Sequence, residues 1–336
     1  MERRERIAVL VPARDAERTL PACLSSIARQ TDPDFRCIVV DDGSTDATAD
    51  VVLQRARQDA RFCLLRQERR GIVAALQLGL AACDEPLVAR MDADDVMHRE
   101  RLRLQRAALD QDPGLAGVGC HARAFPSSAF GDGTRGYMEW LRTIRDERDV
   151  LRERFVESPL LHPTWMMRTE TLRRAGYRDG TWAEDYDAML RMLGDGARLS
   201  VVPRTLHAWR RSESSATNTD PRYSEDARAA LKAARLCDGP LAASDHYVLW
   251  GHGSTGRRLR RALLAHGRRP IAVVELDPRK IGQRIDGAPV VSPDGLAPHR
   301  SAPILVSVAH AGPRAAARRR LADLGLVELR DFFCCA

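Results

Sequence analysis

Lysine is nearly absent from this chain of 336 residues: Lys232 and Lys280 are the only two, so arginine supplies almost all of the positive charge. Aromatic residues are also scarce, at 5%. The net charge is +7, but the arginines are spread along the chain without interleaved aromatics. Because a nucleic-acid surface needs such a stripe, we expect no nucleic-acid partner. The charge instead suits anionic nucleotides or an anionic membrane face.

Long apolar runs and paired cysteine motifs are missing as well. No run reaches the roughly 18 residues of a membrane span, and the run after the charged start 1–6 is too short for a signal peptide. The eight cysteines include no C-x-x-C pair, and several lie in apolar runs. This pattern predicts free, mostly buried thiols in a reducing compartment. We expect a soluble cytoplasmic protein, at most peripheral at the inner face of the membrane.

Apolar residues make up 44% of the chain and charged residues 29%, which predicts a globular protein with room for two domains. In the N-terminal third, short apolar runs alternate with amphipathic stretches, which favours a mostly parallel α/β sheet with helices on both faces. The expected strands cover 7–11, 35–40, 61–65, 87–91 and 115–120. The expected helices cover 16–29, 46–59, 72–83 and 99–109.

The remaining pattern divides at Asp238-Gly239-Pro240, so we expect domains at 1–238 and 239–336. Before the break we expect loops at 126–135 and 212–221, helices at 136–156 and 224–236, and a strand at 199–209. After the break the β-α-β rhythm restarts, with strands at 247–250, 271–274 and 304–308 and helices at 257–266 and 313–324.

The most informative motif is Met91-Asp92-Ala93-Asp94-Asp95, directly after an apolar run. Its three carboxylates repel one another, and a hard divalent cation bound through oxygens would relieve that repulsion. The alternative is that Asp95 caps the following helix. Two other polar clusters, 12–15 and 41–44, also follow predicted strands. The carboxyl ends of parallel strands form one edge, where α/β sheets bind ligands.

Together, 7–15, 37–46, 91–95 and 184–187 resemble the family 2 glycosyltransferases, which are inverting enzymes on the GT-A fold. The resemblance covers roughly residues 5–235 and implies a nucleoside-diphosphate sugar donor. It places Pro12, Ala13 and Arg14 against the base, and Asp42 on a base N–H. The alternative for Asp42 is a turn cap before Gly43.

The same resemblance makes Asp92 and Asp94 the D-x-D pair. Asp92 is expected near the ribose or the metal, and Asp94 on an Mn²⁺ or Mg²⁺ ion that assists the departing diphosphate. Arg210 or Arg211 would clamp the diphosphate, and His207 is a weaker candidate for a metal ligand. The chain departs from many relatives at Ala75-Leu76-Gln77, where an Arg contact to the donor is missing.

An inverting transfer needs one base to deprotonate the acceptor hydroxyl. The resemblance implies that Asp185 is this base, that Glu184 orients it or binds acceptor, and that Asp187 is a second candidate. The alternative is a set of first-turn acids that complement a helix dipole. His162 would line the acceptor side; otherwise it is a hydrogen-bonded core histidine.

The C-terminal segment Gly251-His252-Gly253-Ser254-Thr255-Gly256 fits G-x-G-x-x-G between a strand and a helix, with Glu275 and Asp277 about 20 residues on. It resembles small Rossmann-like domains of sugar-modifying acetyltransferases and nucleotide-sugar dehydratases. The resemblance implies that Gly251, Gly253, Gly256 and Asp277 bind NAD(H) or a nucleotide. A degenerate fold kept for packing is the alternative.

The sequence as a whole predicts an inverting glycosyltransferase whose acceptor is a hydroxyl of a polysaccharide, a lipid-linked glycan or a protein glycan. A regulator or scaffold of glycan assembly that binds nucleotide sugars without turnover is the alternative. A nucleotidyltransferase fits less well, because residues 12–15 lack its Gly-rich basic loop. Donor sugar, linkage and oligomeric state are left open.

Overall fold

The computed structural model describes residues 6–126, 128, 131–212 and 215–336. The start of the chain, part of the loop expected at 126–135, and residues 213–214 of the loop expected at 212–221 lie outside the described residues. Two compact units emerge from the contacts. The first comprises 1–150, 159–179 and 184–219, and the second comprises 151–158, 180–183 and 220–336. The division therefore differs from a single cut after residue 238.

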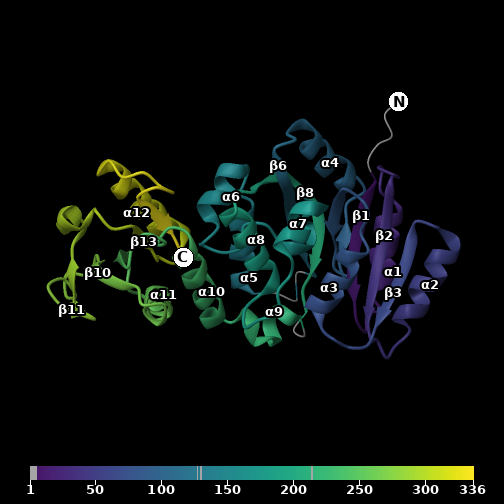
Figure 1. The fold of residues 1–336 in the computed structure, drawn as a ribbon, viewed down its shortest axis with the longest axis horizontal. Helices are drawn as coiled ribbons and strands as arrows, with labels where there is room; N and C mark the ends of the chain where they lie inside the picture. The colour runs from purple at the N-terminus through teal and green to yellow at the C-terminus, as the bar shows by residue number, and fades with distance from the viewer. Residues whose placement is uncertain (1–5, 127, 129–130, 213–214) are drawn as a thin grey trace. The chain divides into compact units, whose positions relative to one another are not determined.

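The first unit is built on a sheet that has eight strands among the described residues, in the order β3-β2-β1-β4-β7-β6-β8-β5 (Figure 1). Strands β3, β2, β1 and β4 are parallel, β6 and β8 are parallel to each other, and β7 and β5 run antiparallel to their neighbours. The bounds are β1 Ile7–Ala13, β2 Phe35–Asp42, β3 Phe62–Gln67, β4 Leu87–Arg90, β5 Val96–Met97, β6 Leu115–Phe125, β7 Met166–Arg168 and β8 Arg198–Arg210. The predicted mostly parallel α/β sheet is confirmed.

Helices alternate with these strands as the amphipathic pattern predicts. The helices of the chain up to residue 238 are α1 Leu20–Ala28, α2 Thr48–Gln58, α3 Ile72–Ala81, α4 Arg101–Gln111, α5 Asp132–Leu141, α6 Glu147–Glu153, α7 Thr169–Ala175, α8 Glu184–Gly194, α9 Ala216–Thr219 and α10 Glu225–Asp238, with short 3₁₀ turns η2 His162–Thr164 and η3 Pro221–Tyr223.

The prediction of one helix over 136–156 is wrong in detail. The chain forms α5 and then restarts as α6, because the Asp146 carboxylate accepts a hydrogen bond from the Asp149 amide (2.9 Å) while the Asp149 carboxylate accepts one from the Arg145 amide (3.0 Å). The bond from the Asp149 amide to the Asp146 side chain is typical of a residue that caps the start of a helix. Helix α5 also begins earlier than expected, at Asp132.

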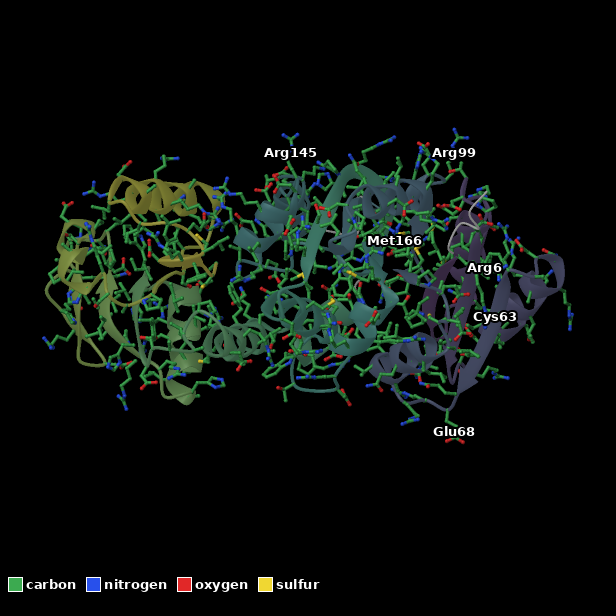
Figure 2. All side chains as sticks on the ribbon, turned by 45° about the horizontal axis from the view of Figure 1, so that its top comes forward. Arg6, Cys63, Glu68, Arg99, Arg145 and Met166 are labelled. Atoms are coloured by element: carbon green, nitrogen blue, oxygen red, sulfur yellow. The ribbon has the colours of Figure 1, made fainter. Side chains whose placement is uncertain are left out.

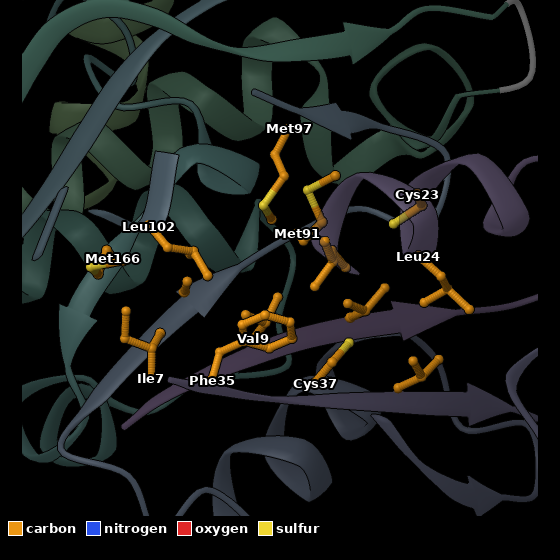
Figure 3. Close-up of a cluster of buried hydrophobic side chains, with 14 of the residues drawn as sticks. Ile7, Val9, Cys23, Leu24, Phe35, Cys37, Met91, Met97, Leu102 and Met166 are labelled. Atoms are coloured by element: carbon orange, nitrogen blue, oxygen red, sulfur yellow. The ribbon is translucent and has the colours of Figure 1, made fainter. Parts of the chain in front are cut away.

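The core of the first unit lies between the sheet and its covering helices (Figure 3). All seven residues of β1 are buried, as expected for a parallel strand covered on both faces. Ile7, Val9, Phe35 and Cys37 bring β1 and β2 into this cluster together with Met91 at the end of β4. Charged side chains lie on the outside of the molecule. Figure 2 shows Arg99, Arg145 and Glu68 pointing outward, whereas Met166 lies inside. A buried apolar cluster thus packs next to the polar ends of β1, β2 and β4.

One buried cation connects several elements of this unit. Arg101, at the start of α4, is fully buried. Its guanidinium donates to the carbonyl oxygens of Arg90 (2.9 Å) and Trp165 (3.2 Å), to the Gln105 side chain (2.9 Å) and to Nδ1 of His207 (3.3 Å). Burial is the first cause that lowers its pKa. Arg101 therefore connects α4 to β4, to the residue that follows η2 and to β8.

Replacement of Arg101 by alanine should destabilise the protein by about 3 kcal/mol, because two buried carbonyls and a buried histidine lose their donor. Urea denaturation followed by fluorescence measures this change. Arg103→Ala, on the exposed face of the same helix, is the matched control and should cost much less. Equal losses for the two variants would contradict the role given to Arg101.

The second unit contains a smaller sheet, with six strands among the described residues in the order β11-β12-β10-β9-β13-β14 (Figure 1). Strands β12, β10, β9, β13 and β14 are parallel, and β11 is antiparallel to β12. The bounds are β9 His246–Trp250, α11 Ser254–Ala265, β10 Arg269–Val274, β11 Arg284–Ile285, β12 Ala288–Val291, η4 Pro293–His299, β13 Ile304–Val306, α12 Ala311–Asp323 and β14 Phe332–Cys334. The predicted second α/β sheet is present.

Two expectations from composition can be compared with the structure. All eight cysteines are free, and six of them are buried. Among the described residues, no helix is long and apolar enough to cross a membrane.

Candidate active site

The polar ends of β1, β2 and β4 meet at one edge of the first sheet, because these three strands are parallel neighbours. The segment after β1 is tied to the segment after β2: the Asp15 amide donates to the Ser44 hydroxyl (2.9 Å), and the Thr45 amide donates to the Asp15 carboxylate (2.9 Å). The Cys23 thiol of α1 donates to the Asp92 carbonyl (3.3 Å), which joins the third segment. Pro12, Ala13 and Arg14 lie along this edge.

Asp42, at the end of β2, is buried and already engaged. Its carboxylate accepts from the Gln67 side chain (2.7 Å) and from the amides of Arg70 (2.8 Å) and Gly71 (2.9 Å). Asp42 thus fixes the segment between β3 and α3, in addition to any role toward a base. Gly43 follows with φ of +67°, and a side chain there would meet the Arg69 backbone nitrogen at 2.6 Å. The turn therefore requires glycine.

Asp92, Asp94 and Asp95 form a cluster in which one carboxylate oxygen from each lies within 4.8 Å of the others. Burial raises the pKa of Asp94 to about 7, helped by the negative charges of Asp92 and Asp95. The pKa of Asp95 is raised for the same first reason. The donor set is all oxygen and strongly anionic, so it fits a hard divalent cation.

The three acids differ in what else they contact. Asp95 is fully buried and accepts from Nε2 of His207 (2.7 Å) and from the Arg210 amide (2.6 Å). It does not cap α4, which begins six residues later after Glu100. Both carboxylate oxygens of Asp95 accept hydrogen bonds from β8. Asp92 and Asp94 are therefore better placed to bind a metal ion.

His207 connects this cluster to Arg101. Since the Arg101 guanidinium can only donate, Nδ1 of His207 accepts and Nε2 carries the proton given to Asp95. Burial, followed by the positive charge of Arg101, lowers the His207 pKa well below its usual value. Both ring nitrogens are committed, so His207 orients Asp95 and is a poor candidate for a metal ligand.

Arg90 is a site residue that sequence reasoning missed. It is buried at the end of β4 and forms an ion pair with Asp92. Its charge also lowers the pKa of His162 and opposes the raised pKa of Asp185. A charged residue that ends the apolar run 87–89, two positions before the first of three acids, was the available signal. Arg90 places one fixed positive charge near both the acidic cluster and the base candidate.

Asp185 lies in the first turn of α8. Burial, and next the negative charge of Glu184, raise its pKa to about 7. One of its oxygens accepts from the Tyr186 amide (2.7 Å), and the other lies 4.0 Å from Nδ1 of His162. A carboxylate with a pKa near neutrality is suited to accept a proton from a hydroxyl.

His162, in η2, is buried beside Asp185. Nε2 of His162 lies 2.9 Å from the Tyr177 hydroxyl, and the ring packs edge-on against Trp165. Burial, then the charge of Arg90, lower its pKa well below the usual value, so the ring is neutral. It thus has the hydrogen bond of a core histidine and a position next to the base candidate.

Asp187 and Arg210 both form contacts that hold neighbouring segments in place. The Asp187 carboxylate is buried against Nε of Arg191 (2.8 Å), which also donates to the Gly176 carbonyl (2.7 Å). Asp187 thereby anchors α8 against the end of α7. Nε of Arg210 donates to the Asp94 carbonyl (2.8 Å), and its guanidinium packs 4.5 Å from the Phe125 ring centre. Arg210 thus lies at the acidic cluster, where a diphosphate clamp is expected.

The predicted glycine loop of the second unit lines a separate cavity of about 530 Å³. Gly251 and Gly253 lie on its wall, and Gly256 packs behind them in α11. Glu275 lines this cavity, whereas Asp277 is paired with Arg279 (3.0 Å) and is not among the lining residues.

The family model for glycosyl transferase family 2 matches residues 8–175, half of the chain. The chain belongs to this family. It is 23% identical to the uncharacterized glycosyltransferase EpsJ of Bacillus subtilis over 63% of this chain and 62% of EpsJ. It is 25% identical to the amylovoran biosynthesis glycosyltransferase AmsE of Erwinia amylovora over 56% of this chain and 68% of AmsE.

Other relatives share shorter stretches: glycosyltransferase GlyA of Streptococcus pneumoniae is 34% identical over 29% of this chain, and the match spans only 14% of GlyA. Among solved structures, S. aureus TarS 1-349 with UDP-GlcNAc gives a TM-score of 0.59 at 19% identity over 78% of this chain and 72% of that one. The mannosyltransferase PcManGT of Pyrobaculum calidifontis with GDP-Man and Mn²⁺ gives 0.53 at 19% identity, over 97% and 82%. These likenesses confirm the predicted GT-A fold.

Replacement of Asp94 by asparagine should weaken Mn²⁺ binding at least about tenfold, because the site loses an anionic oxygen ligand. Calorimetric titration of the purified protein with Mn²⁺ measures the affinity. Asp110→Asn, an exposed acid at the end of α4, is the control and should bind Mn²⁺ like the wild type. Unchanged affinity in Asp94→Asn would show that the cluster is not the metal site.

Proposed function

We propose that the protein is an inverting glycosyltransferase that moves a sugar from a nucleoside-diphosphate donor to a hydroxyl acceptor in glycan synthesis. The observation that carries this proposal is the pairing of two sites in one unit: an acidic cluster at the strand ends, and a half-buried carboxylate, Asp185, whose pKa is raised to about 7. Membership of family 2 supports the same reaction. A regulator without turnover would have no need of such a base.

On this proposal the donor lies along the edge formed by β1, β2 and β4. Pro12, Ala13 and Arg14 contact the base, and Asp42 accepts from a base N–H while it holds residues 70–71. Asp92 and Asp94 hold Mn²⁺ or Mg²⁺, which when bound neutralises charge on the diphosphate. Arg210 extends its guanidinium from the same cluster toward the diphosphate. The TarS and PcManGT complexes contain UDP-GlcNAc and GDP-Man, which supports a donor of this class.

The acceptor side is formed by α8 and η2. Asp185 takes the proton from the acceptor hydroxyl as that oxygen attacks the sugar carbon. Glu184 keeps the Asp185 pKa high by its negative charge, and Arg90 limits that rise. Neutral His162 lies beside Asp185, where it can hydrogen-bond the acceptor. Asp187, bound to Arg191, keeps α8 in place.

We further propose that the acceptor belongs to a polysaccharide, a lipid-linked glycan or a protein glycan, and that the protein works in the cytoplasm, with peripheral contact to the inner face of the membrane. The net charge of +7 supports contact with an anionic surface. NAD(H) or another nucleotide in the second unit is a separate proposal, which the cavity beside Gly251 and Gly253 supports.

Asp185→Asn should lower the rate of sugar transfer by about 10²–10⁴-fold, because the amide cannot accept the hydroxyl proton. Transfer is measured by release of nucleoside diphosphate with Mn²⁺ and a panel of acceptors. Asp195→Asn, exposed just beyond the other end of α8, should retain full activity. An active Asp185→Asn would exclude Asp185 as the base.

The pH dependence follows from the raised Asp185 pKa. Only the carboxylate form can act as base, so kcat/KM should fall as the pH drops below about 7. In Glu184→Gln the neighbouring negative charge is gone, so the Asp185 pKa should decrease and the acid limb should move to lower pH. A limb that stays in place in Glu184→Gln would mean that another group titrates.

A further inference from the structure

The cavity of the second unit lies where the strand order of its sheet reverses. Strand β9 is central, with β10 on one side and β13 on the other, and all three are parallel. The cavity, about 530 Å³, opens beyond the carboxyl ends of these strands. Open α/β sheets bind ligands in such a crevice, because the chain leaves the two neighbouring strands in opposite directions.

The glycines of the loop after β9 have distinct spatial reasons. Gly251 has φ of +92°, and a side chain there would meet the Ser307 carbonyl at 2.8 Å. A side chain on Gly256 would meet the Gly251 carbonyl at 2.2 Å, so glycine lets α11 pack against the loop. A side chain on Gly253 would meet nothing within 4 Å. Gly253 lines the cavity, and the fold therefore leaves open space beside its backbone, ahead of the twelve-residue helix α11.

Two polar groups at the cavity have no partner among the described residues. Ser307, directly after β13, is 2% exposed, and its hydroxyl makes no hydrogen bond within that part of the chain. Nε2 of His252 is likewise buried without a partner there. Buried polar groups are almost always hydrogen-bonded in folded proteins, so unpaired ones that line a cavity point to a ligand. This observation is independent of the glycine pattern.

The cavity is lined by one acidic side chain, Glu275, and by two cationic side chains, Lys280 and Arg320. The Glu275 carboxylate, directly after β10, accepts from the His252 amide (3.0 Å) and from Nζ of Lys280 (3.2 Å). A carboxylate at the end of the second strand is placed to accept from ribose hydroxyls. The two cationic side chains and the amino end of α11 favour the binding of phosphate oxygens.

We propose that this cavity binds a ribose joined to a pyrophosphate, with the pyrophosphate against Gly253 and the start of α11 and the ribose hydroxyls on Glu275. Ser307 and His252 donate to or accept from the ligand. Either a nicotinamide dinucleotide or a nucleoside-diphosphate sugar carries this group. The proposal extends the nucleotide binding proposed for the second unit and does not depend on the glycosyl-transfer site.

Glu275 should also determine which nicotinamide dinucleotide the cavity prefers. A ribose with a 2′-phosphate would bring negative charge against the carboxylate, so NADPH should bind more weakly than NADH. Asp277 lies outside the cavity and should not affect this preference. The residue that decides is therefore Glu275 and not the acid two positions later.

The test uses the full-length protein with Asp92→Asn and Asp94→Asn, in EDTA, so that metal-assisted donor binding in the first unit is suppressed. Calorimetric titration with NADH, NADPH, UDP-GlcNAc and GDP-Man separates the two ligand sources. We expect one equivalent of NADH or of a nucleotide sugar to bind, and NADPH to bind at least about tenfold more weakly than NADH.

Gly253→Ala should weaken the bound ligand at least about tenfold, because the methyl group occupies the space for the pyrophosphate while the fold accepts it. Gly136→Ala is the matched control: its side chain would also meet nothing, and it lies in α5 of the other unit. Glu275→Gln should reduce the preference for NADH over NADPH, and Asp277→Asn should leave it unchanged.

Absence of binding by all four ligands would overturn the proposal, and so would binding that Gly253→Ala and Gly136→Ala affect equally. Neither result bears on glycosyl transfer, which is measured with the native acids and Mn²⁺. Conversely, an inactive transferase that still binds NADH through Gly253 would leave this site intact.

Discussion

The repulsion among Asp92, Asp94 and Asp95 governs the design of the first unit. The negative charges of three acids at the end of β4 need positive charge nearby, and two buried arginines supply it. Arg90 pairs with Asp92, and Arg101 acts on Asp95 through neutral His207. Because Arg101 also holds the carbonyls of Arg90 and Trp165, the same side chain supports the acids and the neighbouring segments. The same side chain therefore stabilises both the site and the fold around it.

This arrangement gives the acids unequal freedom. Asp95 is locked to β8 from both oxygens, whereas Asp94 contributes its carbonyl to Arg210 and has its carboxylate at the cluster. An acidic motif read only as sequence treats the three positions alike. In the structure, Asp95 is an internal hydrogen-bond partner of β8, whereas Asp92 and Asp94 are the residues that can contact a ligand.

Much of the fold could be predicted from the sequence, since the strands at 7–11, 35–40 and 87–91 are apolar runs and the strand ends carry their polar residues. Strands β5 and β7 were missed because two or three residues carry no periodic pattern; Met166–Arg168 is a strand only because β4 and β6 lie on its two sides. The role of Arg101 could not be predicted either, and for Arg90 the one signal was its place between the apolar run 87–89 and the acidic motif. An arginine normally indicates a surface position, and only the tertiary contacts show these two to be internal counter-charges.

The division of the chain has a consequence for its modular character. Residues 151–158 belong with the C-terminal sheet, where Arg152 pairs with Glu328 and Lys232 donates to the Val156 carbonyl. A gene fragment that starts at residue 239 would encode the glycine loop and Glu328, but not Arg152, Val156 or Lys232. The second unit is thus not an appendage that recombination could add or remove at one junction. The segments of the two units alternate along one polypeptide.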